Sequence, residues 1–360
     1  MAAADRDGVT YWYDCCASNN DVDPRLQQRQ DREEDEYEMK EEEEEEVEEC
    51  VDDEPMHITG RLFLGSIDAA RNVTALKRLR ISTTLALLGK GEEVAVLSRS
   101  TSVLAIEYTE QQITRTLVEI EDSKDGNLLR RIPGILATLG KIIKKAERHG
   151  MNVLVHCIAG RSRSASVVAA WMLVSEPKLP SVQDVVDRIR IIRPWIEINA
   201  HFMQDLHLFH AVLGSTDRAT LSVEMALLLT DRSFPRLDFG ANLVDGIVQG
   251  TKTITMRLLS DIESDQHSDL GDIFPYSVVT ATTVSPCTNS TPRRMQFAYL
   301  LIDQIDIQDL RDIDQAILHK TGFDSTDEVL AVLKQYYPNV TTATSLLMLH
   351  FHYLCPGVAK

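Results

Sequence analysis

Residues 153–174 read VLVHCIAGRSRSASVVAAWMLV. The first three residues are apolar and suit a buried strand in the middle of a parallel sheet. Residues 164–174 are apolar nearly all round, which predicts a buried helix. Between the two runs lies a loop that starts at Cys157 and holds small and basic residues. The order of strand, loop and helix predicts that the loop wraps the amino end of the helix.

This loop has the composition of an anion-binding site. The amino end of a helix presents unpaired N–H groups and a positive partial charge. Cys157 and Arg163 enclose five residues, a length that can circle one phosphate. The local field favours the ionised thiolate of Cys157, and Arg163 can bind two phosphate oxygens at once. A structural cysteine beside an ordinary helix cap is the alternative, but it accounts neither for His156 nor for the run 160–164.

The surrounding sequence predicts an α/β domain. Apolar segments at 58–64, 85–88 and 104–106 have the length of strands, with Gly60 at a turn. Helical spacing of apolar residues runs over 69–79 and 128–148, and Gly150 follows the second helix. Strands that alternate with helices imply a layered fold with a central, mostly parallel sheet.

The loop and its flanks resemble the dual specificity protein phosphatases of the cysteine-dependent superfamily, with their H-C-x-A-G-x-S-R-S core. The resemblance spans residues 56–213. Residues 58–66 (ITGRLFLGS) resemble the family's opening strand pair, and residues 191–194 (IIRP) with Asn199 resemble its closing segment. Three positions depart from the family pattern, where proline, glycine and glutamine are usual: Ile198, His201 and Asp205.

The resemblance implies a two-step mechanism without a metal or cofactor. Cys157 would attack phosphorus and form a thiophosphate, Ser164 would help the sulfur to leave, and His156 would buttress the loop rather than act as a base. The residues implied to bind the phosphate are Ile158, Ala159, Gly160, Arg161, Ser162 and Arg163.

A general acid must protonate the leaving oxygen. The resemblance places it in an aspartate loop before the cysteine, which residues 122–128 (DSKDGNL) match with Asp122 at the acid position. Asp125 and Glu121 are the rivals. No carboxylate–histidine cluster in the sequence suggests a metal site.

Residues 221–355 have a different sequence pattern, with more strand-like segments, which predicts a second, β-rich α+β domain. Strand patterns cover 244–257, 273–284, 296–307 and 341–354, and helical patterns cover 312–318 and 326–336. Residues 250–257 (GTKTITMR) fit the G-x-K-x-x-x-x-R pattern and resemble ASCH domains, a family with a PUA-like β-barrel.

The ASCH resemblance implies a cleft for RNA or a modified nucleoside, faced by Lys252, Thr255 and Arg257. A glutamate of that family has no assigned counterpart here; Asp303, Asp306 and Asp309 lie in the region concerned. An ordinary strand with an exposed lysine and arginine is the alternative.

Charge is distributed unevenly along the chain. The net charge is −18, and residues 1–55, which include the run Glu41–Glu46, account for −17 of it. Like charges repel and stay solvated, so we predict a disordered acidic tail over 1–55. A tail that mimics phosphate and inhibits the mildly basic segment 56–220 is the alternative. Residues 214–220 have the composition of a linker.

Cysteine usage and hydropathy indicate the compartment. The six cysteines are scattered without metal-site spacing, which argues against a disulfide framework: Cys15, Cys16, Cys50, Cys157, Cys287 and Cys355. No signal peptide and no membrane-spanning stretch is evident. We therefore expect a cytoplasmic or nuclear protein.

Three functions are compatible with these patterns. The first is a dual specificity phosphatase acting on phosphoproteins at tyrosine and serine/threonine, recruited to RNA or a ribonucleoprotein by the ASCH domain. The second is an RNA 5′-phosphatase or nucleotide phosphatase. The third is a phosphate-binding adaptor without catalysis, which the presence of Cys157, Arg163 and Asp122 disfavours.

Overall fold

The computed structural model describes residues 52–92, 112–176, 178–215, 221–259, 269–285 and 293–357. The first domain contains one five-stranded sheet in the order β1-β2-β5-β3-β4. Its strands are β1 (Met56–Thr59), β2 (Leu62–Gly65), β3 (Ile81–Leu88), β4 (Thr114–Glu119) and β5 (Asn152–His156). Strands β1 and β2 form an antiparallel hairpin, and the pairs β2–β5, β5–β3 and β3–β4 are parallel.

The sheet is buried on both faces. Alternate side chains of a strand point to opposite faces, and β5 shows the result: Val153 and Val155 join the main core, whereas Leu154 joins a smaller core on the other side. Helices α2 (Ile67–Arg71) and α3 (Val73–Arg78) cover the smaller core. The main core is covered by α6 (Leu128–Arg148), α7 (Arg163–Ser175), α8 (Val182–Ile192) and α9 (Ala200–Leu213).

Most elements around the phosphate loop lie where the sequence predicts them. The structure confirms the helix over 128–148 and the strand and helix on either side of Cys157. The predicted strand at 58–64 is the β1–β2 hairpin, with Gly60 in its turn at a φ of +52°. The predicted helix at 69–79 is divided in two, because the side chain of Asn72 caps the second helix by accepting from Ala75 N. The predicted strand at 104–106 lies outside the described residues.

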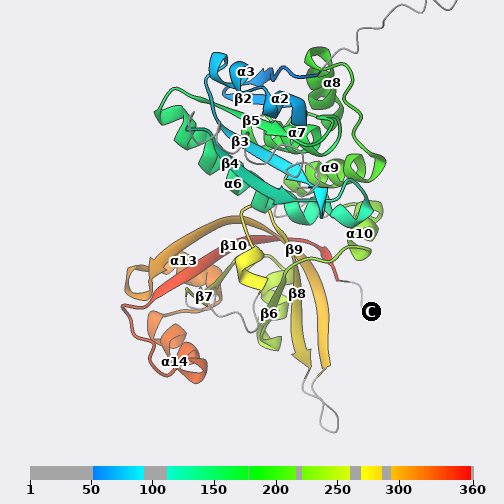
Figure 1. Cartoon of the computed structure of the whole chain (residues 1–360). Coiled ribbons are helices and arrows are strands. Elements are labelled where there is room, and N and C mark those ends of the chain that lie inside the picture. Colours follow the sequence, from blue (N-terminus) through cyan, green and yellow to red (C-terminus); the bar gives the residue numbers. More distant parts are fainter. Residues whose placement is uncertain are drawn as a thin grey trace, which may run out of the picture. The chain divides into compact units, whose positions relative to one another are not determined.

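The C-terminal region forms a second five-stranded sheet in the order β6-β8-β9-β10-β7. The strands are β6 (Arg236–Phe239), β7 (Ile254–Leu258), β8 (Val278–Ser285), β9 (Arg293–Asp309) and β10 (Ser345–Pro356). Strand β6 pairs with β8 in parallel and the other neighbours are antiparallel. Figure 1 shows the long strands β9 and β10 sweeping across this region. The helices are α10 (Val223–Thr230), α11 (Val244–Val248), α13 (Gln315–Thr321) and α14 (Thr326–Tyr336), with short 3-10 turns that include η3 (Asp269–Asp272).

Two predictions for this region need correction. The strand expected over 244–257 is wrong in its first half, where residues 244–248 form α11 and only 254–258 form a strand. A short apolar run does not distinguish helix from strand by its pattern, and here Ile247 faces the core from a helix. Among the described strands, the sheet does not close into a barrel by pairing β6 with β7; Arg257 of β7 instead reaches Asp238 O of β6 with its side chain.

The main core of the first sheet extends into the C-terminal region, which also has two apolar clusters of its own. The main core around α6, α7 and α9 continues into Leu229, Phe234 and Tyr299 of the C-terminal region. Phe209 of α9 meets the ring of Tyr276 edge to face. Among the described helices, none is both long and apolar enough to cross a bilayer.

Candidate active site

Cys157 lies at the bottom of the loop between β5 and α7. Its side chain is buried, and its Sγ accepts from Gly160 N at 3.2 Å and from Ser164 Oγ at 3.3 Å. Both donors stabilise negative charge on sulfur. The loop therefore holds the sulfur atom between two hydrogen-bond donors at the amino end of α7.

The loop directs its carbonyl groups outward. Five successive carbonyls each accept a bond from outside the loop centre: Cys157 O from His156 Nδ1, Ile158 O from Ile67 N, Ala159 O and Gly160 O from Arg193, and Arg161 O from Glu197 N. In a trans peptide the N–H points opposite to the preceding carbonyl. Of the amides that follow these carbonyls, Gly160 N donates to the Cys157 sulfur, and the others point toward the loop centre, where an anion can bind.

Arg163 is bound by Glu92. The guanidinium donates from Nη1 to Glu92 Oε2 at 2.5 Å and from Nη2 to Oε1 at 3.3 Å, and it is buried. Burial alone would raise the pKa of Glu92, but the hydrogen bonds from Arg163 and Gly89 lower it on balance. Among the described residues, Arg163 Nε makes no hydrogen bond, but it forms an ion pair with Asp122 Oδ2 at 3.7 Å. One face of the guanidinium fork thus remains for a ligand.

Asp122 lies at the entrance of the loop. Its Oδ1 accepts from Ser162 Oγ at 2.6 Å and from Asn199 Nδ2 at 2.5 Å. The two rivals lie elsewhere: Glu121 accepts from Lys90 N, and Asp125 lies in the 3-10 turn Lys124–Gly126. The structure therefore brings Asp122 to Arg163, and Asn199 is a further site residue that orients it.

His156 is fully buried behind the loop. Burial, with a smaller contribution from Arg115, lowers its pKa to about 4 despite the bond to Cys157 O. The ring is neutral at pH 7 and donates from Nδ1 to that carbonyl at 3.2 Å. This geometry suits a buttress of the loop.

Arg193 and Asp52 form a brace that sequence reasoning did not find. Arg193 is completely buried; its Nε donates to Gly160 O at 2.9 Å and its Nη2 to Ala159 O at 3.2 Å. Asp52 accepts from Nη1 at 2.8 Å and also pairs with Nη2. Asp52 belongs to the segment 1–55 that was expected to be a disordered tail; residues 1–51 of it lie outside the described part. The I-R-P resemblance pointed to Arg193 but not to this partner.

The residues expected to face an ASCH cleft are differently placed. Lys252 is 4% exposed, and its Nζ donates to Ile254 O and Thr321 O. Thr255 is 3% exposed and accepts from Arg257 Nη1, whose guanidinium also lies over the ring of Phe239. Burial, then the charge of Arg257, lowers the pKa of Lys252 to about 7. A cavity of about 370 Å³ lies nearby, and its lining includes Thr251, Thr253, Asp303, Lys320 and His350 but none of the three.

A chain of hydrogen bonds connects Ser215, His352 and Asp303. Ser215 Oγ lies 2.9 Å from His352 Nε2, and His352 Nδ1 lies 2.9 Å from Asp303 Oδ1. The hydroxyl of Ser215 donates its one proton to Val212 O at 2.7 Å. These bonds connect the end of α9 to His352 of β10 and Asp303 of β9. Within the described ranges, no cluster of histidine, cysteine and carboxylate groups has the form of a metal site.

Comparison with known proteins agrees with this geometry. Residues 62–211 match the family model of the dual specificity phosphatase catalytic domain. A Dictyostelium discoideum protein named as a probable dual specificity protein phosphatase is 30% identical over 169 residues, which cover 46% of this chain and 68% of that protein. A relative from Invertebrate iridescent virus 6 is 35% identical over 100 residues, covering 28% of this chain and 66% of that protein.

In other relatives, the matched region covers a smaller share of the protein's length. It spans 12% of a dual specificity phosphatase of Arabidopsis thaliana, 34% of one of Drosophila melanogaster and 31% of one of Homo sapiens. A solved structure, that of the human tyrosine phosphatase-like serine/threonine/tyrosine-interacting protein, aligns at 23% identity over 45% of this chain and 99% of that chain, with a TM-score of 0.35. With its phosphate loop, its catalytic-domain match and its Dictyostelium relative, the chain belongs to the dual specificity phosphatase family.

Proposed function

We propose that the protein hydrolyses phosphate monoesters of phosphoproteins, at tyrosine and at serine or threonine, through a cysteinyl-phosphate. The observation that carries this proposal is the arrangement at Cys157. A thiol with two donors on sulfur lies inside a loop whose carbonyls point outward, and Arg163 Nε pairs with Asp122 at 3.7 Å. An adaptor that only binds phosphate would need neither the donor from Ser164 to sulfur nor an aspartate at the entrance.

The reaction would proceed in two steps. The Cys157 thiolate attacks phosphorus, an S–P bond forms, and the P–O bond to the leaving group breaks as protonated Asp122 gives its proton to that oxygen. Loop amides and Arg163 stabilise the equatorial oxygens. Water then attacks phosphorus and passes a proton to Asp122, while the S–P bond breaks and Ser164 donates to the departing sulfur.

Cys157→Ser tests this assignment, with Cys355→Ser as the matched control. Both sulfurs are buried, but burial raises the pKa of the Cys355 thiol to about 11, so that thiol is inert at neutral pH. We expect Cys157→Ser to abolish turnover of 4-nitrophenyl phosphate and Cys355→Ser to leave it unchanged. Turnover that survives in Cys157→Ser would contradict the mechanism.

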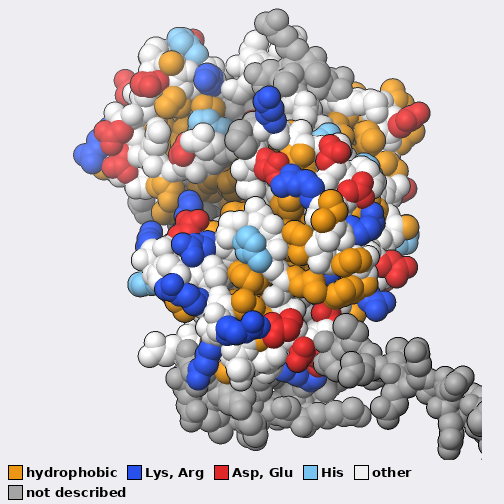
Figure 2. Space-filling model, turned by 90° about the horizontal axis from the view of Figure 1, so that it is seen from above, with side chains coloured by type: hydrophobic (Ala, Val, Ile, Leu, Met, Phe, Trp, Pro, Cys, Tyr) orange, Lys and Arg blue, Asp and Glu red, His pale blue; other side chains and the backbone are white. Residues whose placement is uncertain are grey.

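One face of the protein bears on the class of substrate. Figure 2 shows that the face seen from above Figure 1 carries both signs of charge, with apolar side chains between them. Binding along a nucleic-acid backbone uses a continuous basic surface. We therefore place phosphopeptides ahead of RNA 5′-phosphates and nucleotides, and we expect the protein to act in the cytosol or nucleus.

A direct comparison separates these substrate classes. Hydrolysis rates of a phosphotyrosine peptide, a phosphothreonine peptide and a 5′-triphosphate RNA would be measured with the full chain at equal concentrations. We expect phosphate release from the peptides; release from the RNA alone would establish the RNA 5′-phosphatase instead.

We also propose that the C-terminal region is an ASCH domain that binds RNA or a modified nucleoside. The proposal is supported by the motif at 250–257 and by the cavity beside it, which contains Lys320 and His350 next to Asp303. With a net charge of −7 over 221–360, a narrow site for a base is favoured over broad backbone binding. Fluorescence anisotropy with a short labelled RNA tests this: we expect binding that Lys320→Gln weakens, and no binding would refute it.

A further inference from the structure

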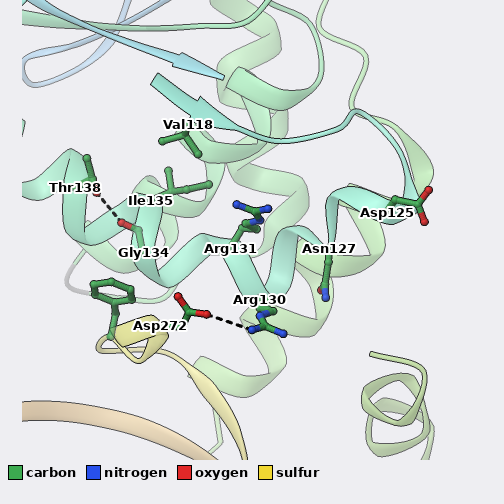
Figure 3. Close-up of a pocket in the computed structure, with 10 residues that line it drawn as sticks. Val118, Asp125, Asn127, Arg130, Arg131, Gly134, Ile135, Thr138 and Asp272 are labelled. Carbon is green, nitrogen blue, oxygen red and sulfur yellow. Dashed lines mark hydrogen bonds and ion pairs between the residues drawn. The ribbon is translucent and has the colours of Figure 1, made fainter. Parts of the chain in front are cut away.

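The first turn of α6 is fastened to the C-terminal region. Asn127 Nδ2 donates to Ser233 O at 3.4 Å, and Arg130 donates to Ser233 Oγ at 2.8 Å and to Asp272 Oδ2 at 3.3 Å. Figure 3 shows Asn127 and Arg130 at the start of α6, with the Arg130–Asp272 ion pair connecting the helix to the η3 turn. These bonds hold the point at which the loop that carries Asp122 enters its helix.

A buried carboxylate makes a second connection at the same place. Asp205 of α9 is 4% exposed; its Oδ2 accepts from Leu129 N at 3.1 Å, and its Oδ1 accepts from Arg232 Nε at 2.9 Å. Arg232 follows α10, and its Nη1 also donates to Leu228 O at 2.5 Å. A buried carboxylate needs a paired charge. Arg232 therefore pairs with the side chain of Asp205 and holds it directed at the α6 backbone.

The loop between Asp122 and this attachment is short and closed on itself. Ser123 caps the 3-10 turn by accepting from Asp125 N, and Asn127 N returns to Lys124 O at 3.2 Å. Gly126 is packed so closely that an added Cβ would lie 2.2 Å from Glu121 O. Such a turn moves as a unit, so a shift at the start of α6 is transmitted to Asp122.

We infer that Arg232 and Ser233, which follow the family-matched segment 62–211, are positioning residues for Asp122 and make the C-terminal region part of the catalytic unit. This inference rests on the proposed role of Asp122 as the general acid. Removal of the bonds from Arg130, Arg232 and Asp205 leaves the loop carbonyls held by Ile67, Arg193 and Glu197. The Cys157 sulfur keeps its bonds from Gly160 N and Ser164 Oγ. The deficit is therefore expected in protonation of the leaving group alone.

The leaving group provides the test. A general acid contributes on the order of 10²- to 10⁴-fold, and more to a basic leaving oxygen than to an acidic one. Values of kcat/KM for phenyl phosphate and 4-nitrophenyl phosphate would be compared in the full chain and three variants. Arg130→Gln removes the bonds to Ser233 Oγ and Asp272. Asp205→Asn/Arg232→Gln removes the buried pair without leaving an unpaired charge. Arg78→Gln, which removes the exposed pair with Glu54, is the control.

We expect kcat/KM of the first two variants to fall roughly 10-fold or more with phenyl phosphate and about 3-fold or less with 4-nitrophenyl phosphate. For Arg78→Gln we expect no change in the ratio of kcat/KM for the two substrates. An equal loss on both substrates would show a merely structural role and overturn the inference. Asp122→Asn separates the two claims. If Asp122→Asn leaves the ratio of kcat/KM for the two substrates unchanged, the proposed acid is wrong. If Asp122→Asn changes this ratio but Arg130→Gln and Asp205→Asn/Arg232→Gln do not, the inference alone is wrong.

Discussion

Arg163 is the residue at which the charges of the site meet. It lies between the carboxylates of Glu92 and Asp122, and both Nη atoms are occupied by Glu92. A phosphate that binds two N–H groups of the fork must use Nε and share or displace Glu92 at Nη2. Glu92 thus sets how strongly the empty loop attracts an anion.

Glu92→Gln keeps a hydrogen-bond acceptor for Arg163 but removes the competing charge. Because charged hydrogen bonds are about twice as strong as neutral ones, we expect inorganic phosphate to inhibit the variant about 3- to 10-fold more strongly at pH 7. Inhibition constants with 4-nitrophenyl phosphate as substrate measure this, with Glu54→Gln as the control. Weaker inhibition would mean that Glu92 holds Arg163 in its binding pose instead.

At the scale of elements, the phosphate loop depends on close backbone contact with β2. Gly160 has a φ of +65°, and an added Cβ would lie 2.5 Å from Gly65 O and 2.5 Å from Arg193 Nη2. Gly60, in the β1–β2 turn, also has a positive φ (+52°) but nothing within 4 Å of an added Cβ. An alanine at either position would suffer backbone strain, but only at Gly160 would its Cβ also clash with neighbouring atoms.

Gly160→Ala and Gly60→Ala make that comparison. Strain from a positive φ costs about 1 kcal/mol in both. Only Gly160→Ala must also push the loop away from β2 and the brace of Arg193, so we expect it to lose at least 100-fold in kcat/KM, a loss of about 3 kcal/mol in transition-state stabilisation. Thermal unfolding and kcat/KM together check this; equal effects of the two substitutions would contradict it.

At the scale of the whole molecule, the C-terminal sheet contains a buried lysine that makes stability depend on pH. Lys252 has a pKa of about 7 in the folded protein, against about 10.4 in an unfolded chain. Between these values the unfolded chain binds more protons, so the free energy of unfolding rises with pH by at most about 1.4 kcal/mol per unit. Below pH 7, Lys252 is protonated in both states and the free energy of unfolding no longer changes with pH through this residue.

Lys252→Met should remove this dependence. We expect the free energy of unfolding from urea titrations at pH 7, 8 and 9 to rise less steeply in the variant than in the unaltered protein. Lys320→Met, at an exposed position of the same region, is the control and should keep the original slope. An unchanged slope in Lys252→Met would show that Lys252 keeps its proton in the fold.

The sequence by itself determined the features that are local in the chain. Cys157, Arg163 and the apolar runs beside them are contiguous, so spacing and periodicity were enough to predict the strand, the loop and helix α7. The helix over 128–148 was equally clear, because 21 residues of regular spacing leave little ambiguity. Asp122 was found through the family resemblance, and the structure places its Oδ2 3.7 Å from Arg163 Nε.

Only the tertiary structure decided which residues complete the site. The hydrogen-bonded pairs are far apart in the sequence: Glu92 and Arg163 by 71 residues, Asp52 and Arg193 by 141, and Asn127 and Ser233 by 106. Such pairs follow from the strand order β1-β2-β5-β3-β4 and from the core shared with the second sheet. The local sequence does not predict these pairs, because each partner, considered by itself, resembles an ordinary charged or polar surface residue.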